Sequence, residues 1–179
     1  MYHLRINDGI VTIRTEVSKA QPKLCTITDL IPGASFHERE VADLFGVTFE
    51  GHPNPARLVL PEDWPEGLYP LRKDVKIDEY LAKKQPLQNQ PDFANAQDGG
   101  ELVNIIVGPQ HPALLEPEKF SLRVDGEIVK QVEPRIGYVH RGVEKASEQR
   151  TYLQDVYLVE RICGICNSCH AACFVEAVE

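Results

Sequence analysis

Apolar and polar residues alternate near the start of the chain, as they do in a β-strand that buries one face. Two β-prone runs, residues 4–6 and 10–17, flank an Asn-Asp-Gly triplet, which is typical of a tight turn. Val11, Ile13 and Val17 fall on one side of the second run, and polar residues separate them. The pattern therefore predicts a β-hairpin with one apolar face.

The period changes to that of a helix over residues 35–46, SFHEREVADLFG. Ser35 and Glu38 are three residues apart, which fits a capping box at the start of the helix. Gly46 fits the left-handed position that commonly ends a helix. The predicted apolar stripe of this helix consists of Val41, Leu44 and Phe45.

Two segments without a regular period follow. Residues 52–74 contain five prolines, which prevent a long helix or a central strand, so we expect an extended, irregular segment on the surface. Residues 75–100 are rich in Gln, Asn, Asp and Lys and end in Gly-Gly, a composition typical of a linker. The predicted organisation is a small α+β domain over residues 1–74, this linker, and a second domain over residues 101–179.

The second domain is predicted to begin with strands and to end with helices. Residues 101–108 are a strand candidate, and residues 120–137 contain a hairpin whose turn is Asp125-Gly126. From Val143 the apolar residues recur at helical spacing, and the last helix reaches the final residue without a stop signal, as if cut. The expected fold class is α+β: a small α+β domain joined by a linker to an antiparallel hairpin or sheet unit, followed by long helices.

Composition and charge exclude several classes of partner. The 179 residues carry 27 acidic and 19 basic side chains, a net charge of −8, so no basic surplus could neutralise nucleic-acid phosphates. No apolar run approaches the roughly 20 residues that span a bilayer. The first residues lack the pattern of a secretory signal. We therefore expect no nucleic-acid partner and no transmembrane segment in this chain, with membrane contact made through other subunits.

Four of the five cysteines lie close together near the end of the chain, and Cys25 stands apart. An odd, clustered set without a secretory signal indicates metal or redox chemistry in a reducing compartment, and not a disulfide framework. The cluster has the spacing C-x2-C-x2-C-x3-C. It consists of Cys163, Cys166, Cys169 and Cys173.

Three interpretations of this cluster compete. A [4Fe–4S] cluster uses the same spacing, but Phe174 replaces the usual proline, and a helix would spread the thiolates over about 10 Å. A zinc site would combine Cys163 and Cys166 with His170 and the last cysteine. The third interpretation is half of a metal site on Cys163 and Cys166, with the other two cysteines as small buried residues on a helix face.

In the third interpretation, Gly164 lets the chain turn tightly between two thiolates at a helix N-terminus. The helix dipole and the free N–H groups there favour the thiolate form. His170 lies one turn beyond Cys166 and is placed to hydrogen-bond a ligand sulfur.

The pattern R-x-C-G-x-C-x3-H, from Arg161 to His170, resembles the N-terminal cysteine motif of [NiFe] hydrogenase large subunits. The segments NIIVGPQHPALLEPEKFSLRVDGEIV and IGYVHRGVEKASEQRTYLQDVYLVERICGIC are similar to the large subunits of membrane-bound, complex-I-related (group 4) hydrogenases, the class that includes formate hydrogenlyase. Residues 35–74 resemble a peripheral-arm subunit of respiratory complex I and its hydrogenase counterpart. Together these segments resemble the N-terminal portion of a fused large subunit.

The resemblance implies roles for individual residues. Cys163 matches a terminal nickel thiolate, and Cys166 matches a thiolate that bridges nickel and iron. Glu116 matches a glutamate that carries protons away from the metal centre, a role that suits a carboxylate in a largely apolar pocket. The sequence alone favours a different reading, in which Glu116, beside Pro117, is a solvated acid in a loop. Three more positions line or flank the same site. They are His111, Arg161 and His170.

Two further sets of residues match positions that have structural or interfacial roles in the family. The motif YVHRGVEK would pack against a subunit that carries iron–sulfur clusters. Its polar members are His140, Arg141 and Glu144. The corresponding positions of the first domain are Glu38, Arg39, Asp43, His52 and Trp64.

As a whole, the resemblance implies part of the catalytic large subunit of a membrane-bound [NiFe] hydrogenase, which interconverts H2 with protons and electrons. The Ni–Fe centre would be shared with a C-terminal cysteine pair that is absent here, so the 179-residue chain alone is expected to be inactive. The implied partners are a small subunit with iron–sulfur clusters and membrane subunits of a complex-I-like assembly, with the chain peripheral on the cytoplasmic side of the membrane. The alternatives are a complex-I-like NADH–quinone oxidoreductase subunit without hydrogenase activity, a sulfur-reducing relative, and a non-catalytic zinc or iron–sulfur module.

Overall fold

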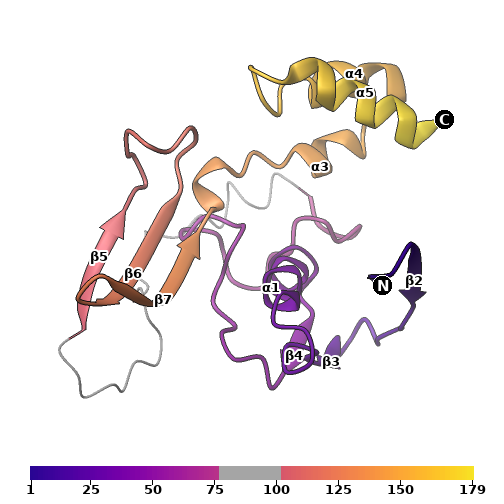
Figure 1. Cartoon of the computed structure of the whole chain (residues 1–179). Coiled ribbons are helices and arrows are strands. Elements are labelled where there is room, and N and C mark those ends of the chain that lie inside the picture. Colours follow the sequence, from indigo (N-terminus) through magenta and orange to yellow (C-terminus); the bar gives the residue numbers. More distant parts are fainter. Residues whose placement is uncertain (77–101) are drawn as a thin grey trace.

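The computed structural model describes residues 1–76 and 102–179 (Figure 1), so the predicted linker lies outside the described residues except for residues 75 and 76. The described parts have the predicted α+β composition, with strands in three small sheets and helices mainly in the last third. Figure 1 shows the sheet β5–β6–β7 on one side of helix α1, and helices α4 and α5 packed together.

The predicted N-terminal hairpin is present. Strands β1 (Tyr2–Ile6) and β2 (Gly9–Ile13) pair antiparallel, and Asn7 has a positive φ of 54° in the turn, which Asn tolerates better than most residues. The second strand ends at Ile13, so Val17 lies outside it and the predicted three-residue apolar face is too long. The apolar side chains of β2 are exposed within the described chain, Ile10 by 72%.

Helix α1 (Ala34–Phe45) lies between two short parallel strands in sequence, β3 (Lys23–Cys25) and β4 (Thr48–Glu50). The helix ends at Gly46 in the left-handed conformation, as predicted. The predicted capping box is wrong, because the N-cap is Gly33 and makes no side-chain hydrogen bond. Glu38 is turned inward instead, and its carboxylate accepts hydrogen bonds from Ile27 N and from Thr26 Oγ1.

The proline-rich segment is irregular, as predicted, but it is not confined to the surface. Leu58, Leu60 and Leu68 are each only 4% exposed and belong to the apolar core. In contrast, Leu44 is the only buried member of the predicted stripe of α1, and Phe45 is 41% exposed. The apolar core of residues 1–76 therefore forms between a helix and an irregular segment.

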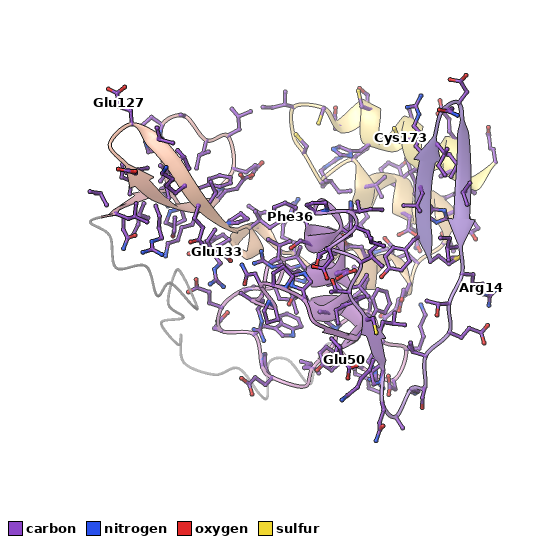
Figure 2. The ribbon with its side chains drawn as sticks, turned by 60° about the horizontal axis from the view of Figure 1, so that its bottom comes forward. Arg14, Phe36, Glu50, Glu127, Glu133 and Cys173 are labelled. Carbon is purple, nitrogen blue, oxygen red and sulfur yellow. The ribbon has the colours of Figure 1, made fainter. Side chains whose placement is uncertain are left out.

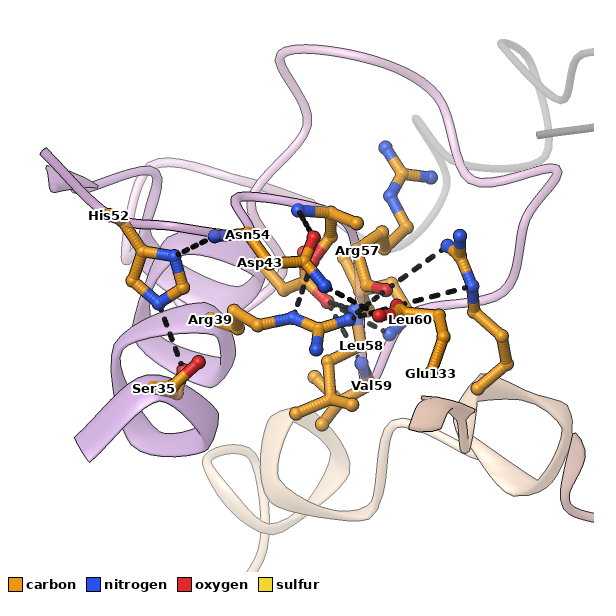
Figure 3. Close-up of polar contacts among 12 residues, drawn as sticks. Ser35, Arg39, Asp43, His52, Asn54, Arg57, Leu58, Val59, Leu60 and Glu133 are labelled. Atoms are coloured by element: carbon orange, nitrogen blue, oxygen red, sulfur yellow. Dashed lines mark hydrogen bonds and ion pairs between the residues drawn. The ribbon is translucent and has the colours of Figure 1, made fainter. Parts of the chain in front are cut away.

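Polar side chains of α1 hold this irregular segment in place (Figure 3). Asp43 Oδ2 accepts hydrogen bonds from three consecutive backbone N–H groups, those of residues 58–60, at 2.9, 2.9 and 3.3 Å. Arg39 donates to the carbonyls of Ala56 and Arg57 at 2.7 and 3.1 Å. These bonds satisfy backbone groups that a segment without regular structure cannot pair internally.

The second half begins with the predicted antiparallel sheet, in the order β5–β6–β7. Strands β5 (Val103–Val107), β6 (Lys119–Asp125) and β7 (Ile128–Arg135) form it. The tight turn between β6 and β7 contains Gly126 at φ 59°, within one residue of the predicted position. The loop between β5 and β6 carries the GPQHP sequence and Glu116.

The helical part differs from the prediction in length. The elements are the 3-10 turn η1 (Gly137–Val139) and helices α3 (Val143–Ser147), α4 (Tyr152–Val159) and α5 (Asn167–Val178), so the expected long helices are short ones. The break after α3 has a local cause, because Thr151 forms a capping box with Gln154 and starts a new helix. None of the helices in the described ranges is long and apolar enough to cross a membrane.

A buried ion pair joins the two halves. Arg39 of α1 donates to Glu133 of β7 at 2.9 Å, and the two side chains are only 3% and 5% exposed. Asn54 donates to the other carboxylate oxygen, and Arg135 Nε lies 3.7 Å from Glu133 Oε1. Figure 2 shows the end of β7, with Glu133, beside α1. The main chain adds a bond from Ile136 N to the Leu58 carbonyl at 3.2 Å.

Candidate metal centre

The two candidate ligand cysteines lie on the loop between α4 and α5. Hydrogen bonds from Arg161 N to the Leu158 carbonyl and from Ile162 N to the Val159 carbonyl, both 3.1 Å, continue the winding of α4 into this loop. Cys166 is the N-cap residue of α5, as expected for a thiol at a helix N-terminus. The cysteine loop, defined here as residues 160–166, therefore connects two helices directly.

Gly164 lies in the bend between the two thiols, where the sequence predicts a tight turn. It is not among the glycines with positive φ, and a Cβ added there would meet no atom of the described chain within 4 Å. The turn between the two thiols is therefore made without a left-handed glycine. The structure leaves open space on this side of the loop.

The two thiols interact and differ in acidity. The backbone N–H of Cys166, the Cys166 thiol and the backbone N–H of Ile165 donate to Cys163 Sγ and lower the pKa of Cys163. The bond to Cys163 raises the pKa of Cys166, because it holds the proton of the donor thiol. Cys163 is half-buried and Cys166 is exposed. The loop thus favours a thiolate on Cys163.

His170 lies one helical turn beyond Cys166, as the spacing predicts. Its Nε2 is 3.4 Å from Cys166 Sγ, within the range of a hydrogen bond to sulfur. The imidazole can therefore orient the Cys166 sulfur. The other two cysteines of the cluster, Cys169 and Cys173, are exposed, so the expectation that they are buried apolar residues is wrong for the described chain.

A cleft of about 1010 Å³ opens beside the loop and brings three of the predicted site residues together. Its lining includes Glu116, Arg161 and Cys163. The negative charge of Glu116 acts on Cys163 and opposes the lowering of its pKa. Glu116 itself is exposed in the described chain, which agrees with the solvated loop acid that its position beside Pro117 favours.

The remaining predicted residue, His111, is not part of the cleft lining. It is exposed in the GPQHP loop, and its Nδ1 accepts a hydrogen bond from Ala113 N at 3.2 Å. His111 therefore caps its own loop. The described residues contain no group of three or more His, Cys, Asp or Glu side chains arranged to hold a metal ion.

Sequence reasoning missed the role of Arg141. Its guanidinium donates to the carbonyls of Arg161 and Ile162 at 2.8 and 2.7 Å, immediately before Cys163. The two partners are 20 and 21 residues away in the chain, so periodicity and spacing carry no signal of this contact.

Both parts of the chain are similar to known proteins. Residues 1–81 match the family described as "Respiratory-chain NADH dehydrogenase, 30 Kd subunit", so the first part of the chain is similar to that subunit. The chain continues beyond this region into the sheet, the helices and the cysteine loop. It is related throughout to subunits of complex-I-like oxidoreductases, and the predicted resemblance is confirmed.

Two relatives come from Escherichia coli (strain K12). The chain is 39% identical to formate hydrogenlyase subunit 5 and 36% identical to hydrogenase-4 component G, each over 94% of this chain and 30% of the relative. It is also 34% identical to the C/D subunit of the NADH-quinone oxidoreductase of Phocaeicola vulgatus, over 97% of this chain and 37% of that protein. The chain thus spans about a third of the length of the curated relatives it matches.

Proposed function

We propose that the chain is part of the catalytic large subunit of a membrane-associated [NiFe] hydrogenase, with Cys163 and Cys166 as two thiolate ligands. The observation that carries the proposal is the C-G-I-C loop, which places the two thiols three residues apart between α4 and α5, with Cys163 lining a large cleft. The similarity to formate hydrogenlyase subunit 5 and to hydrogenase-4 component G supports it.

The donor set fits half of such a centre. Two adjacent thiols suit a soft metal, while the described residues offer no third ligand grouped with them. The remaining thiolates would therefore come from outside this sequence. When bound, a nickel–iron centre would supply the two-electron chemistry that interconverts H2 and protons.

The side chains of this chain would bind and move protons around that centre. Cys163 Sγ is held by two backbone N–H groups, and Cys166 Sγ is oriented by His170. The Glu116 carboxylate faces the same cleft and can exchange a proton between Cys163 Sγ and solvent. Arg161 adds a fixed positive charge to the lining.

The proposal extends to partners and location. A small subunit with iron–sulfur clusters would deliver electrons, and membrane subunits would hold the complex on the cytoplasmic side of the membrane. Large apolar side chains near the cysteine loop are exposed in the described chain and fit burial by such a partner. They are Tyr152, Leu153, Tyr157 and Ile165.

The metal content of the assembled complex tests the proposal. The complex purified anaerobically with this chain should contain nickel together with iron, and Cys163→Ser or Cys166→Ser should remove most of both metals. Cys25→Ser is the matched control, because Cys25 is also exposed but belongs to β3, outside the loop. Retention of nickel in both loop variants would contradict the ligand assignment.

The second candidate function is that of a complex-I-like NADH–quinone oxidoreductase subunit without hydrogenase activity. The similarity to the C/D subunit of NADH-quinone oxidoreductase over 97% of the chain favours it. The same experiment separates the candidates. A complex without nickel that still transfers electrons to a quinone supports this second candidate, whereas reduction of sulfur compounds by a nickel-containing complex supports the sulfur-reducing relative.

A further inference from the structure

Arg141 makes a two-pronged contact with the backbone of the cysteine loop. One terminal nitrogen donates to the Arg161 carbonyl at 2.8 Å and the other donates to the Ile162 carbonyl at 2.7 Å. The planar guanidinium suits this paired geometry, since its donors form a rigid fork. Both carbonyls lie directly before Cys163, so the contact fixes the peptide units that lead into the first thiol.

Among the described residues, the other hydrogen bonds of the loop stay within the loop and its two helices. The last carbonyls of α4, those of Leu158 and Val159, accept from Arg161 N and Ile162 N, and the carbonyls of Arg161 and Ile162 that follow accept from Arg141. Helix α5, which follows the loop, has no buried residue in the described structure. Open space surrounds Gly164. Arg141 therefore supplies donors where the loop has few other restraints.

Arg141 is itself held on both sides by the N-terminal domain. Before it, His140 packs edge-on against the Trp64 ring, with 5.6 Å between ring centroids. After it, Lys145 is buried and donates to the Arg72 carbonyl at 3.1 Å. Gly137 lies so close to the Leu60 carbonyl that an added Cβ would approach it to less than 3.0 Å. The segment that carries Arg141 is thus fixed to residues 60–72.

We propose that Arg141 is a positioning residue that couples the N-terminal part of the chain to the cysteine loop and fixes the backbone in front of Cys163. The first part of the chain then holds the loop with the metal ligands in a fixed position, in addition to any contact it makes with other subunits. The coupling itself follows from contacts within this chain. Its consequence for metal binding rests on the proposed function.

The test compares three variants of the 179-residue chain: Arg141→Ala, Arg141→Lys and Arg150→Ala. Arg150 is the matched control, because it is an exposed arginine that also donates to a carbonyl, Ala146 at 2.7 Å, but does not contact the loop. Amide hydrogen exchange is measured over residues 161–166, with the amides of β6 and β7 as the internal control for folding. Binding of Ni2+ is followed in parallel by nickel–thiolate absorption.

We expect Arg141→Ala to speed exchange in the loop by about tenfold and to weaken Ni2+ binding by about tenfold or more, the usual effect of removing support behind a metal ligand. Arg141→Lys should keep only part of the wild-type protection of the loop and only part of the wild-type Ni2+ affinity, because lysine has no planar pair of donors. Arg150→Ala should match wild type, and exchange in β6 and β7 should be unchanged throughout.

Two outcomes separate this inference from the proposed function. Loop exchange that is the same in Arg141→Ala and wild type would overturn the positioning role of Arg141, whatever metal the chain binds. Absence of nickel from the complex assembled with the wild-type chain, with loop exchange still dependent on Arg141, would overturn the metal-ligand proposal and leave the coupling in place. Faster exchange in β6 and β7 as well would also contradict the inference, since the effect would then be global.

Discussion

At the scale of single residues, His140 joins the two halves through its ring and not through a hydrogen bond. Its Nε2 is buried without a hydrogen-bond partner among the described residues, and its ring packs against Trp64. Burial lowers the pKa of His140, and the negative charges of Glu144 and Asp43 oppose this shift only in part. The neutral imidazole is therefore the form that fits the folded protein.

The shift of His140 predicts a pH dependence of stability. The unfolded chain binds the proton with an ordinary pKa of about 6.5, and the folded chain binds it only at lower pH. The contribution of this group is therefore fully present above about pH 6.5 and is lost as the pH falls toward the folded-state pKa. His140→Phe, which keeps an aromatic ring but cannot titrate, should flatten the free energy of unfolding between about pH 7.5 and 5.

Urea denaturation at a series of pH values measures this effect. His37→Phe is the control, because the His37 side chain is 82% exposed on α1. The His37 variant should keep the wild-type slope of stability against pH. A slope that is equally steep in His140→Phe and in wild type would show that another group causes it.

At the scale of elements, the end of α1 depends on a glycine for two separate reasons. Gly46 has φ 75°, and an added Cβ would lie less than 3.0 Å from the Tyr69 ring. Gly67 has a similar φ of 73° but no neighbour within 4 Å. Substitution of these two glycines therefore separates two contributions to the loss of stability, that of the backbone conformation and that of the close contact with the Tyr69 ring.

We predict that Gly67→Ala lowers the free energy of unfolding by about 1 kcal/mol, the cost of a left-handed alanine. Gly46→Ala should cost about 2–4 kcal/mol, because displacement of the Tyr69 ring adds to the same backbone term. Denaturant unfolding of the two variants side by side measures the difference. Equal losses would mean that the ring moves aside freely and that the contact has no cost.

The elements also show what sequence patterns can and cannot predict. Both hairpins, helix α1 and its terminal glycine follow from local signals, since turn residues and periodicity act over a few neighbours. The inward face of α1 does not follow, because Arg39 is buried by a partner 94 residues away. The same reason hides Arg141 from the site prediction, while Cys163 and Cys166 are recognisable because their motif is contiguous.

At the scale of the whole molecule, the buried ion pair makes the two halves depend on each other. Glu133 accepts from Arg39 and Asn54 and faces Arg135, so removal of its charge takes the anion from the buried ion pair with Arg39. Loss of one partner of a buried pair typically costs about 3–5 kcal/mol. Glu133→Gln should therefore destabilise the chain by about this amount, although it preserves the volume of the side chain.

The same contacts predict a single unfolding transition for the chain. Trp64, the only tryptophan, packs against His140 at the junction, so its fluorescence reports on the contact between the halves. Hydrogen exchange of β6 and β7 reports on the second half alone. In wild type the two probes should give one midpoint, because separation of the halves would expose the Arg39–Glu133 pair.

In Glu133→Gln the fluorescence midpoint should fall to lower denaturant than the exchange midpoint, since the junction opens before the sheet does. Glu16→Gln is the control, because the Arg14–Glu16 pair is highly exposed, at 73% and 84%, and such pairs contribute at most about 1 kcal/mol. Two separate midpoints in wild type would show that the ion pair does not couple the halves. The N-terminal part of the chain could then not hold the cysteine loop in a fixed position.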